Sequence, residues 1–185
     1  MVENRIITKT PFFKSELLVA FMSMPLSEAS KSIKLLAVVG LLISPWLLTQ
    51  LGIALLAPDE KIDTMPDCES DSGNCAHLGG GDTYRMDSSM ATLLEINYTE
   101  VIAKLVDYID DNDADILVES TTNTSYYVHF VEKTSFWQFP DDIVISITDT
   151  TDSCVIEMHS QSRLGRGDIG VNPDRLDQIY ETLIA

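Results

Sequence analysis

Two adjacent carboxylates, Asp141 and Asp142, are the residues whose type and spacing most directly suggest acid–base or metal chemistry. With His159 and Arg163 they would suit a small hydrolase or a metal-dependent enzyme. Neighbours on a strand point to opposite faces of a sheet, however, so these carboxylates would rarely share one proton. A turn in which an Asp side chain bonds the backbone is the favoured interpretation. The sequence contains no nucleophile elbow, phosphate-binding loop or dinucleotide fingerprint, so no catalytic residue is assigned.

Potential metal ligands are scattered along the sequence. Cys75-Ala76-His77 offers two of them, but no second cluster completes a zinc site. The acidic run 110–115 fails the EF-hand template, because Ile116 and Thr122 stand where glycine and glutamate are required. The sequence therefore predicts no bound metal and no other cofactor.

The stretch 160–172 has the highest density of specialised residues, with glycines, arginines and an aspartate between a strand pattern and a helix start. One interpretation is a corner in which Arg163 and Asp168 pair across the loop and Asn172 caps the helix. The other is an anion or carboxylate site made by Arg163, Arg166 and the helix N-terminus. An acidic residue beside that terminus argues against a strong anion site, and the corner is favoured.

This stretch resembles the C-terminal motif of the domain of unknown function 1499 family. The motif residues are Ser160, Ser162, Arg163, Gly165, Asp168, Gly170, Val171, Asn172 and Arg175. Two further matches are an aromatic before paired aspartates (Phe139, Asp141, Asp142) and an Asn-Cys pair (Asn74, Cys75). The likeness covers about residues 66–185 and departs at His159, where the family more often has arginine. The resemblance implies no reaction, and it makes these residues the candidate binding set: Asp141, Asp142, Ser160, Ser162, Arg163, Asp168, Asn172 and Arg175.

Residues 35–57 are 23 residues without a charge. As a helix they would reach about 34 Å, enough to cross a hydrocarbon core of about 30 Å. The stretch is too long for a typical cleaved signal peptide, so it predicts one uncleaved transmembrane helix. The segment 12–24 is apolar but too short to span; it is either an interfacial helix or a product of the choice of start codon.

Charge predicts the orientation of this helix. Lys31 and Lys34 lie directly before it, and positively charged flanks stay in the cytoplasm. Residues 58–185 carry seven Lys/Arg and 26 Asp/Glu, a formal charge of −19. Such a domain repels nucleic acid, so a nucleic-acid partner is not expected. The sequence predicts a cytoplasmic segment at 1–34, a bacterial inner-membrane span at 35–57 and a periplasmic remainder.

Residues 58–97 read as a loop-rich connector, with prolines, three consecutive glycines and many Asp and Ser residues. Cys68 and Cys75 lie within it and could close a disulfide in an oxidising compartment. Cys154 falls inside a strand pattern and is expected to be buried.

Residues 98–185 predict an α+β domain in the order helix, four strands, helix. The expected helices are 99–112, capped by Thr99, and one that begins at Asn172 with Pro173 in its first turn. The expected strands are 115–121, 126–133, 143–148 and 154–160. Short connections favour one antiparallel sheet with both helices on one face, in two layers. What covers the other face stays open.

The aromatic run 136–140 either packs on the sheet edge, forms a binding lip or touches the membrane interface, and packing is favoured. The expected function is a membrane-tethered, extracytoplasmic binding or assembly module with a possible protein partner in the envelope and an unknown ligand. The alternative is the small enzyme described above, using Asp141, Asp142, His159 and Arg163.

Overall fold

The structure is a computed structural model that describes residues 30–185. The described residues divide into two units between Leu47 and Leu48. Helix α2, Lys31–Leu56, contains Pro45 and buries none of its residues. It is long and apolar enough to cross a membrane, a property that a signal sequence near the N-terminus shares. The expected helix at 12–24 and most of the expected cytoplasmic segment lie outside the described residues.

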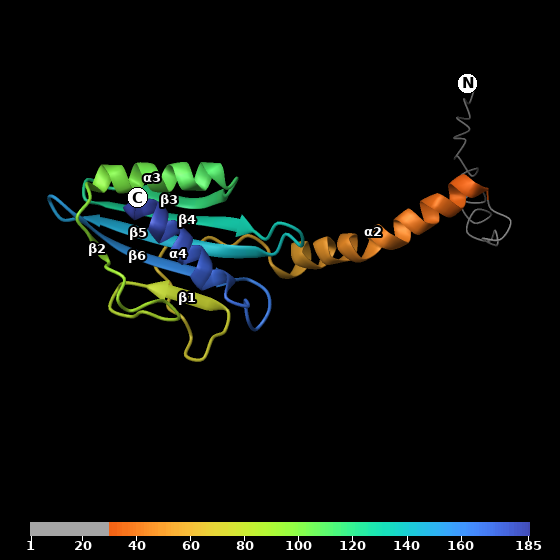
Figure 1. Cartoon of the computed structure of the whole chain (residues 1–185), viewed down its shortest axis with the longest axis horizontal. Helices are drawn as coiled ribbons and strands as arrows, with labels where there is room; N and C mark the ends of the chain where they lie inside the picture. Colours follow the sequence, from red (N-terminus) through yellow and green to blue (C-terminus); the bar gives the residue numbers. More distant parts are fainter. Residues whose placement is uncertain (1–29) are drawn as a thin grey trace, which may run out of the picture. The chain divides into compact units, whose positions relative to one another are not determined.

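The sheet has six strands, not the four predicted. The strands are β1 (Cys75–Leu78), β2 (Leu93–Leu94), β3 (Asp115–Thr121), β4 (Ser125–Lys133), β5 (Pro140–Asp149) and β6 (Cys154–Ser162). Their order is β1-β6-β5-β4-β3, all antiparallel, and β2 also pairs with β6 (Figure 1). The two additional strands come from the connector. They have four and two residues, too few for an alternating pattern to be recognised among loop residues.

Helices α3 (Tyr98–Asp111) and α4 (Val171–Ile184) pack on one face of the sheet (Figure 1). The hydrophobic core lies between them and the sheet. Strand β5 illustrates the pattern, because Ile143, Ile145 and Ile147 all join this core. Cys154 is buried and free, as predicted.

The helix starts differ from the predicted ones by one or two residues. Asn97, not Thr99, is the N-cap of α3, and its side chain accepts a hydrogen bond from the Thr99 backbone N–H. Helix α4 begins after Gly170, whose φ of 90° suits a glycine. Asn172 is therefore buried inside the first turn and is not the cap. A sequence pattern rarely fixes a terminus more closely than this.

The second face of the sheet is partly covered by the chain that follows α2. The backbone N–H of Ile62 donates to His129 Nδ1 at 3.1 Å, and the Tyr127 hydroxyl donates to the Ile62 carbonyl at 2.9 Å. Arg163 donates to the Pro58 carbonyl at 3.2 Å. The segment 58–62 thus crosses the face that the helices leave open.

Candidate functional site

Asp141 and Asp142 are both buried, and they face opposite sides of the sheet. Asp141 accepts a hydrogen bond from Arg175 of α4 at 2.8 Å. Asp142 is bonded to His129 and Arg163 on the other side. The paired aspartates of the sequence therefore serve two separate networks, and neither is part of a carboxylate dyad.

On the second face, Asp142 joins β4 to the end of β6. His129 accepts from the backbone on Nδ1, so its Nε2 donates to Asp142 Oδ1 at 2.7 Å. Arg163 donates hydrogen bonds to both carboxylate oxygens of Asp142, at 2.9 and 2.7 Å, and a further one to Asp59 Oδ1 at 2.6 Å. Burial raises the pKa of Asp142, but hydrogen bonds from His129 and Arg163 outweigh it and leave that pKa below its ordinary value. Neither nitrogen of His129 is left to act as a base.

Arg163 and Asp168 do not pair across the loop, which corrects the sequence-based expectation. Asp168 instead receives two hydrogen bonds from Arg85 of the connector, at 3.0 and 2.7 Å. It also accepts from the backbone N–H groups of Gly170 and Asn172. Burial alone would raise the pKa of Asp168, but these donors lower it to about 2. Because Arg163 is paired with Asp142 and Asp59, it is not available for the alternative anion site at this loop.

On the helix face, the remaining motif residues form a second network around Arg175. Arg175 bridges Asp141 and Glu132, each at 2.8 Å. Burial, which outweighs the attraction of Arg175, raises the pKa of Asp141. The network ties α4 to β4 and β5 beneath the helix start.

A chain of amide and hydroxyl groups extends this network to the connector. Ser160 donates to Asn172 Oδ1 at 2.6 Å, and Asn172 Nδ2 donates to Ser162 Oγ at 3.1 Å and to the Asn74 carbonyl at 3.0 Å. The Asn74 side chain donates in turn to the Ser162 carbonyl at 2.7 Å. All eight candidate residues are thus engaged in internal contacts. Arg85 and Glu132, which complete the networks, were missed because no local pattern marks them.

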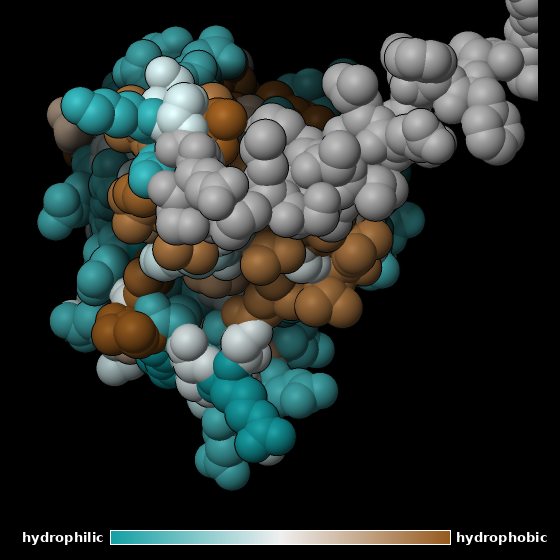
Figure 2. All heavy atoms as spheres, turned by 90° about the vertical axis from the view of Figure 1, so that its right-hand side faces the viewer, coloured by the Kyte–Doolittle hydropathy of each residue, from teal (hydrophilic) through white to brown (hydrophobic). Residues whose placement is uncertain are grey.

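Above this network lies the motif pocket, a cavity of about 360 Å³. It is lined by Thr134, Phe139, Asp141, Ser162, Leu164, Gly165, Gly167, Asp168, Ile169 and Val171. The lining surface is largely apolar, and Asp141, Ser162 and Asp168 are among its polar residues. Figure 2, turned by 90° from Figure 1, shows hydrophobic side chains exposed among hydrophilic ones on this side of the molecule. The pocket is therefore suited to an apolar group.

A second cavity, of about 240 Å³, lies on the other face and includes Asp142, Gln161 and Arg163 in its lining. The residues of the enzyme hypothesis do not meet there as a set. Asp142 and Arg163 pair with each other, whereas Asp141 lies on the opposite face. His159 is fully buried, its Nε2 lies 3.1 Å from Gln161 Oε1, and its Nδ1 lies 3.3 Å from His77 Nδ1. The arrangement holds charges in place and offers no activated nucleophile among the described residues.

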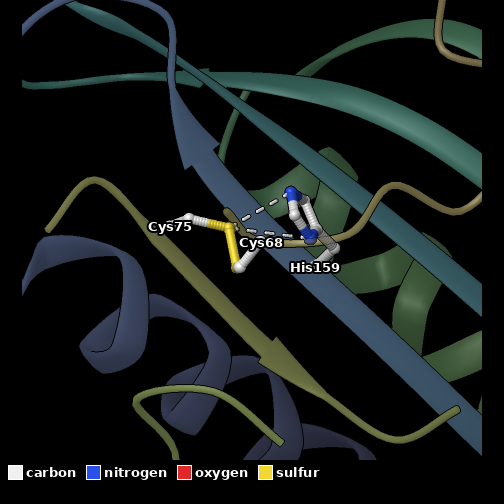
Figure 3. A group of neighbouring side chains, drawn as sticks. All are labelled: Cys68, Cys75 and His159. Atoms are coloured by element: carbon white, nitrogen blue, oxygen red, sulfur yellow. Dashed lines mark hydrogen bonds between the residues drawn. A yellow bond between two sulfur atoms is a disulfide. The ribbon is translucent and has the colours of Figure 1, made fainter. Parts of the chain in front are cut away.

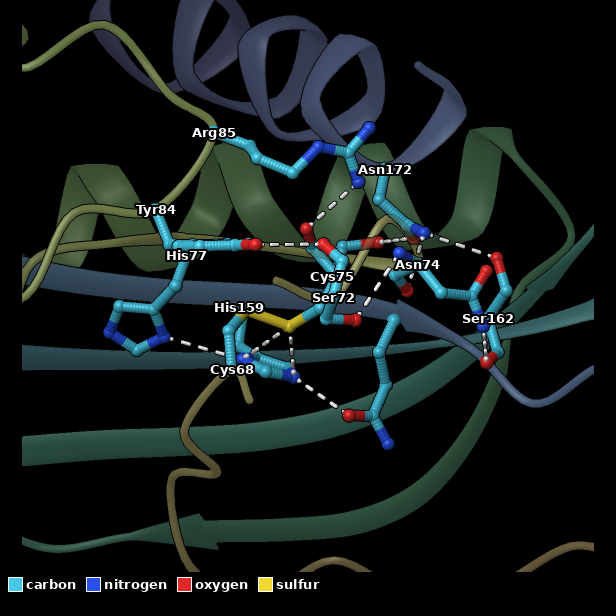
Figure 4. Close-up of a disulfide and its surroundings, with 12 residues drawn as sticks. Cys68, Ser72, Asn74, Cys75, His77, Tyr84, Arg85, His159, Ser162 and Asn172 are labelled. Carbon is cyan, nitrogen blue, oxygen red and sulfur yellow. Dashed lines mark hydrogen bonds between the residues drawn. A yellow bond between two sulfur atoms is a disulfide. The ribbon is translucent and has the colours of Figure 1, made fainter. Parts of the chain in front are cut away.

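The predicted disulfide is confirmed. Cys68 and Cys75 are joined, with their Cα atoms 5.8 Å apart, and the bond lies beside His159 (Figure 3). His77 and His159 are cross-strand partners on β1 and β6, with 3.3 Å between their Nδ1 atoms (Figure 4). Burial lowers the pKa of His159 to about 4. No local sequence pattern indicates this grouping, because Cys68 and His159 are far apart along the chain.

Comparisons with other proteins agree with the motif. A family model described as "Protein of unknown function (DUF1499)" matches residues 64–183, which confirms the resemblance. No curated protein matches the sequence. Among solved structures, the chain is similar to the vertebrate conserved region of human METTL16, with 13% identity and a TM-score of 0.34. That similarity covers 46% of this chain and 74% of the other, and it is too weak to carry an argument.

Proposed function

The chain belongs to the DUF1499 family, and we propose that it is a membrane-tethered module that binds an envelope partner outside the cytoplasm. The tether is α2, which is long and apolar enough to span. Lys31 and Lys34 at its start favour a cytoplasmic N-terminus, most simply in a bacterial inner membrane with the domain in the periplasm.

The observation that carries the binding role is the backbone conformation and full exposure of Ile169. This β-branched residue has a φ of 55° and is fully exposed on the rim of the motif pocket. A positive φ costs a β-branched residue on the order of 1–3 kcal/mol. Burial within the described domain does not offset that cost, because the side chain points into solvent. An apolar side chain held this way is best explained by contact with a partner.

Two further exposed apolar residues, Phe139 and Val171, line the same pocket. Phe136 and Trp137 are also exposed and belong to the β4–β5 loop that ends at Phe139. Large apolar patches commonly mark interaction sites. The hydrogen-bond networks around Arg175 and Asp168 hold the loop 163–170 in one conformation. Less conformational entropy is therefore lost when a partner binds. We therefore assign the motif a scaffolding role, and the pocket and its rim the binding role.

The chemistry of the partner follows from the surface. The pocket suits an apolar side chain, and a domain with a formal charge of −19 favours a basic protein over an acidic one. The partner we propose is thus an envelope protein with an exposed apolar residue flanked by Lys or Arg. The enzyme hypothesis is not favoured, because Asp142 and Arg163 neutralise each other, Asp141 lies on the opposite face of the sheet, and His159 is fully buried.

Photo-crosslinking in intact cells tests this function. The full chain would carry a benzophenone amino acid at Ile169, or at Asp152 as the matched control. Asp152 is also exposed and also lies in a loop, that between β5 and β6. We expect Ile169 to give a discrete protein adduct that the control lacks. Adducts from neither position, equal adducts from both, or adducts to lipid alone would contradict a protein-binding pocket.

A further inference from the structure

Three potential metal donors lie together on the second face of the sheet. Cys68 Sγ, Cys75 Sγ and a nitrogen of His159 are all within 4.8 Å of one another (Figure 3). His77 adds a second imidazole beside them (Figure 4). We propose that the two cysteines, when their disulfide is reduced, bind a thiophilic divalent ion such as Zn²⁺ together with His77 and His159.

The donor separations fit one tetrahedral ion. With bonds of about 2.0–2.3 Å, neighbouring donors around zinc are about 3.3–3.8 Å apart. The Nδ1 atoms of His77 and His159 are 3.3 Å apart. Cys75 Sγ lies 3.8 Å from His159 Nδ1 and 3.6 Å from its Nε2. Opening the disulfide lets the two sulfurs move apart to the spacing of two thiolate ligands.

The outer hydrogen bonds present the imidazoles as ligands. His77 Nε2 lies 3.4 Å from Glu157 Oε1, and His159 Nε2 lies 3.1 Å from Gln161 Oε1. Both oxygens are acceptors, so each Nε2 carries the proton and each Nδ1 carries a lone pair. Two lone pairs then face each other across the same space, which a cation fills. Carboxylate–histidine–metal arrangements of this kind orient zinc ligands in other proteins.

The site is also accessible. A cavity of about 260 Å³ opens beside it and includes Asp67, Glu69, Cys75 and Gln161 in its lining. The two acidic side chains favour the entry of a cation. Cys68 is only partly buried, so a reductant can reach the disulfide. The cavity through which a cation can enter and the proposed metal-donor atoms thus lie side by side.

Reduction of the disulfide, followed by metal binding, is a redox switch in which two electrons are exchanged. A dithiol reductant supplies two electrons and two protons, its own thiols form a disulfide, and the Cys68–Cys75 bond becomes two thiols. The metal then displaces both thiol protons into solvent. A disulfide oxidant reverses the sequence by removing two electrons from the thiolates, which re-forms the bond and expels the ion.

Cobalt substitution tests the site on the detergent-solubilised full chain. After reduction by a dithiol and its removal without oxygen, we expect one Co²⁺ per chain, with thiolate-to-cobalt charge transfer and the visible bands of tetrahedral cobalt. The oxidised chain should bind none. Cys154→Ala is the matched control, because Cys154 is the free, buried cysteine of the described chain, and this variant should behave as the wild type.

The variants separate a built site from simple thiol binding. Cys75→Ser should abolish the bands, and the double variant His77→Gln/His159→Gln should lose their tetrahedral pattern. Glu157→Gln should weaken cobalt affinity roughly 10- to 100-fold. Zinc should also raise the thermal unfolding midpoint of the reduced chain, which reports binding even if reduction loosens the fold. Absence of cobalt bands in the reduced wild type, their persistence in the double histidine variant, or equal binding by the oxidised chain would each overturn the proposal.

Discussion

Asp168 receives hydrogen bonds from three separate parts of the chain. Arg85 comes from the connector, and the Gly170 and Asn172 N–H groups come from the start of α4. The carboxylate side chain is almost fully buried, while Arg85 is partly exposed. One residue thereby joins the connector, the motif loop and the last helix.

Replacing Asp168 by alanine should destabilise the domain by about 3 kcal/mol, because the partly exposed Arg85 guanidinium and two backbone N–H groups lose their acceptor. Asp152→Ala is the matched control and should change stability by less than about 0.5 kcal/mol, because Asp152 is exposed. Denaturant unfolding of the solubilised chain, followed by circular dichroism, measures both. Equal stability of the two variants would show that Asp168 is not a structural anchor.

His159 makes stability depend on pH. Its pKa is about 4 in the folded protein and about 6.5 in the unfolded chain, so the unfolded state binds more protons between these values. Stability from this group is complete above pH 6.5 and is lost as the pH falls towards 4. Between pH 7 and pH 5 we expect a loss of about 2 kcal/mol from His159 alone.

The His159→Gln variant isolates this contribution. Its absolute stability can differ from that of the wild type, but its slope between pH 7 and pH 5 should be shallower by the same amount. Unfolding of the oxidised protein at several pH values measures the slope. Parallel pH profiles of the two proteins would mean that His159 titrates normally in the fold.

At this scale the motif was predictable from the sequence, but its pairings were not. Arg163 and Asp168 were expected to be structural residues that bind each other. Their partners, Asp142 and Arg85, come from distant segments. Pairings across more than 20 residues depend on strand order and on the path of the connector, which local patterns do not encode.

At the scale of elements, α3 begins where Asn97 accepts the Thr99 N–H at 2.9 Å. Asn97→Ala should destabilise the domain by about 1 kcal/mol, since a helix N–H loses its acceptor. Thr99→Ala should cost less, because the Thr99 hydroxyl only donates to Asn97. Thermal unfolding of both variants compares them. A larger loss of thermal stability for Thr99→Ala would show that Thr99 is the N-cap of α3, as the sequence indicated.

The longer elements were predictable and the short ones were not. Strand β3 matches its predicted bounds, and β5 alternates so regularly that its core face was evident. Strands β1 and β2 were missed because their residues look like loop residues until β6 provides their partners. The segment that covers the second face was missed for the same reason. Segment 58–62 has no periodic pattern, and its hydrogen bonds with His129 and Tyr127 form only when the domain is folded.

At the scale of the whole molecule, the apolar residues of α2 and the acidic residues of the following domain are concentrated in different parts of the chain. Helix α2, which carries no charge from Leu35 onward, precedes a domain with a formal charge of −19. The disulfide and the free, buried Cys154 suit an oxidising compartment. The proposed function depends above all on the side of the membrane on which the acidic domain lies.

Labelling of one introduced cysteine at a time in intact cells tests that placement most directly. The full chain would carry Asp152→Cys in the exposed β5–β6 loop or Ser30→Cys before α2, with the wild type reporting background labelling. A membrane-impermeant maleimide, added after the outer membrane is permeabilised, should label position 152 in intact cells and position 30 only after lysis. Labelling of position 152 only after lysis would contradict a tethered domain outside the cytoplasm.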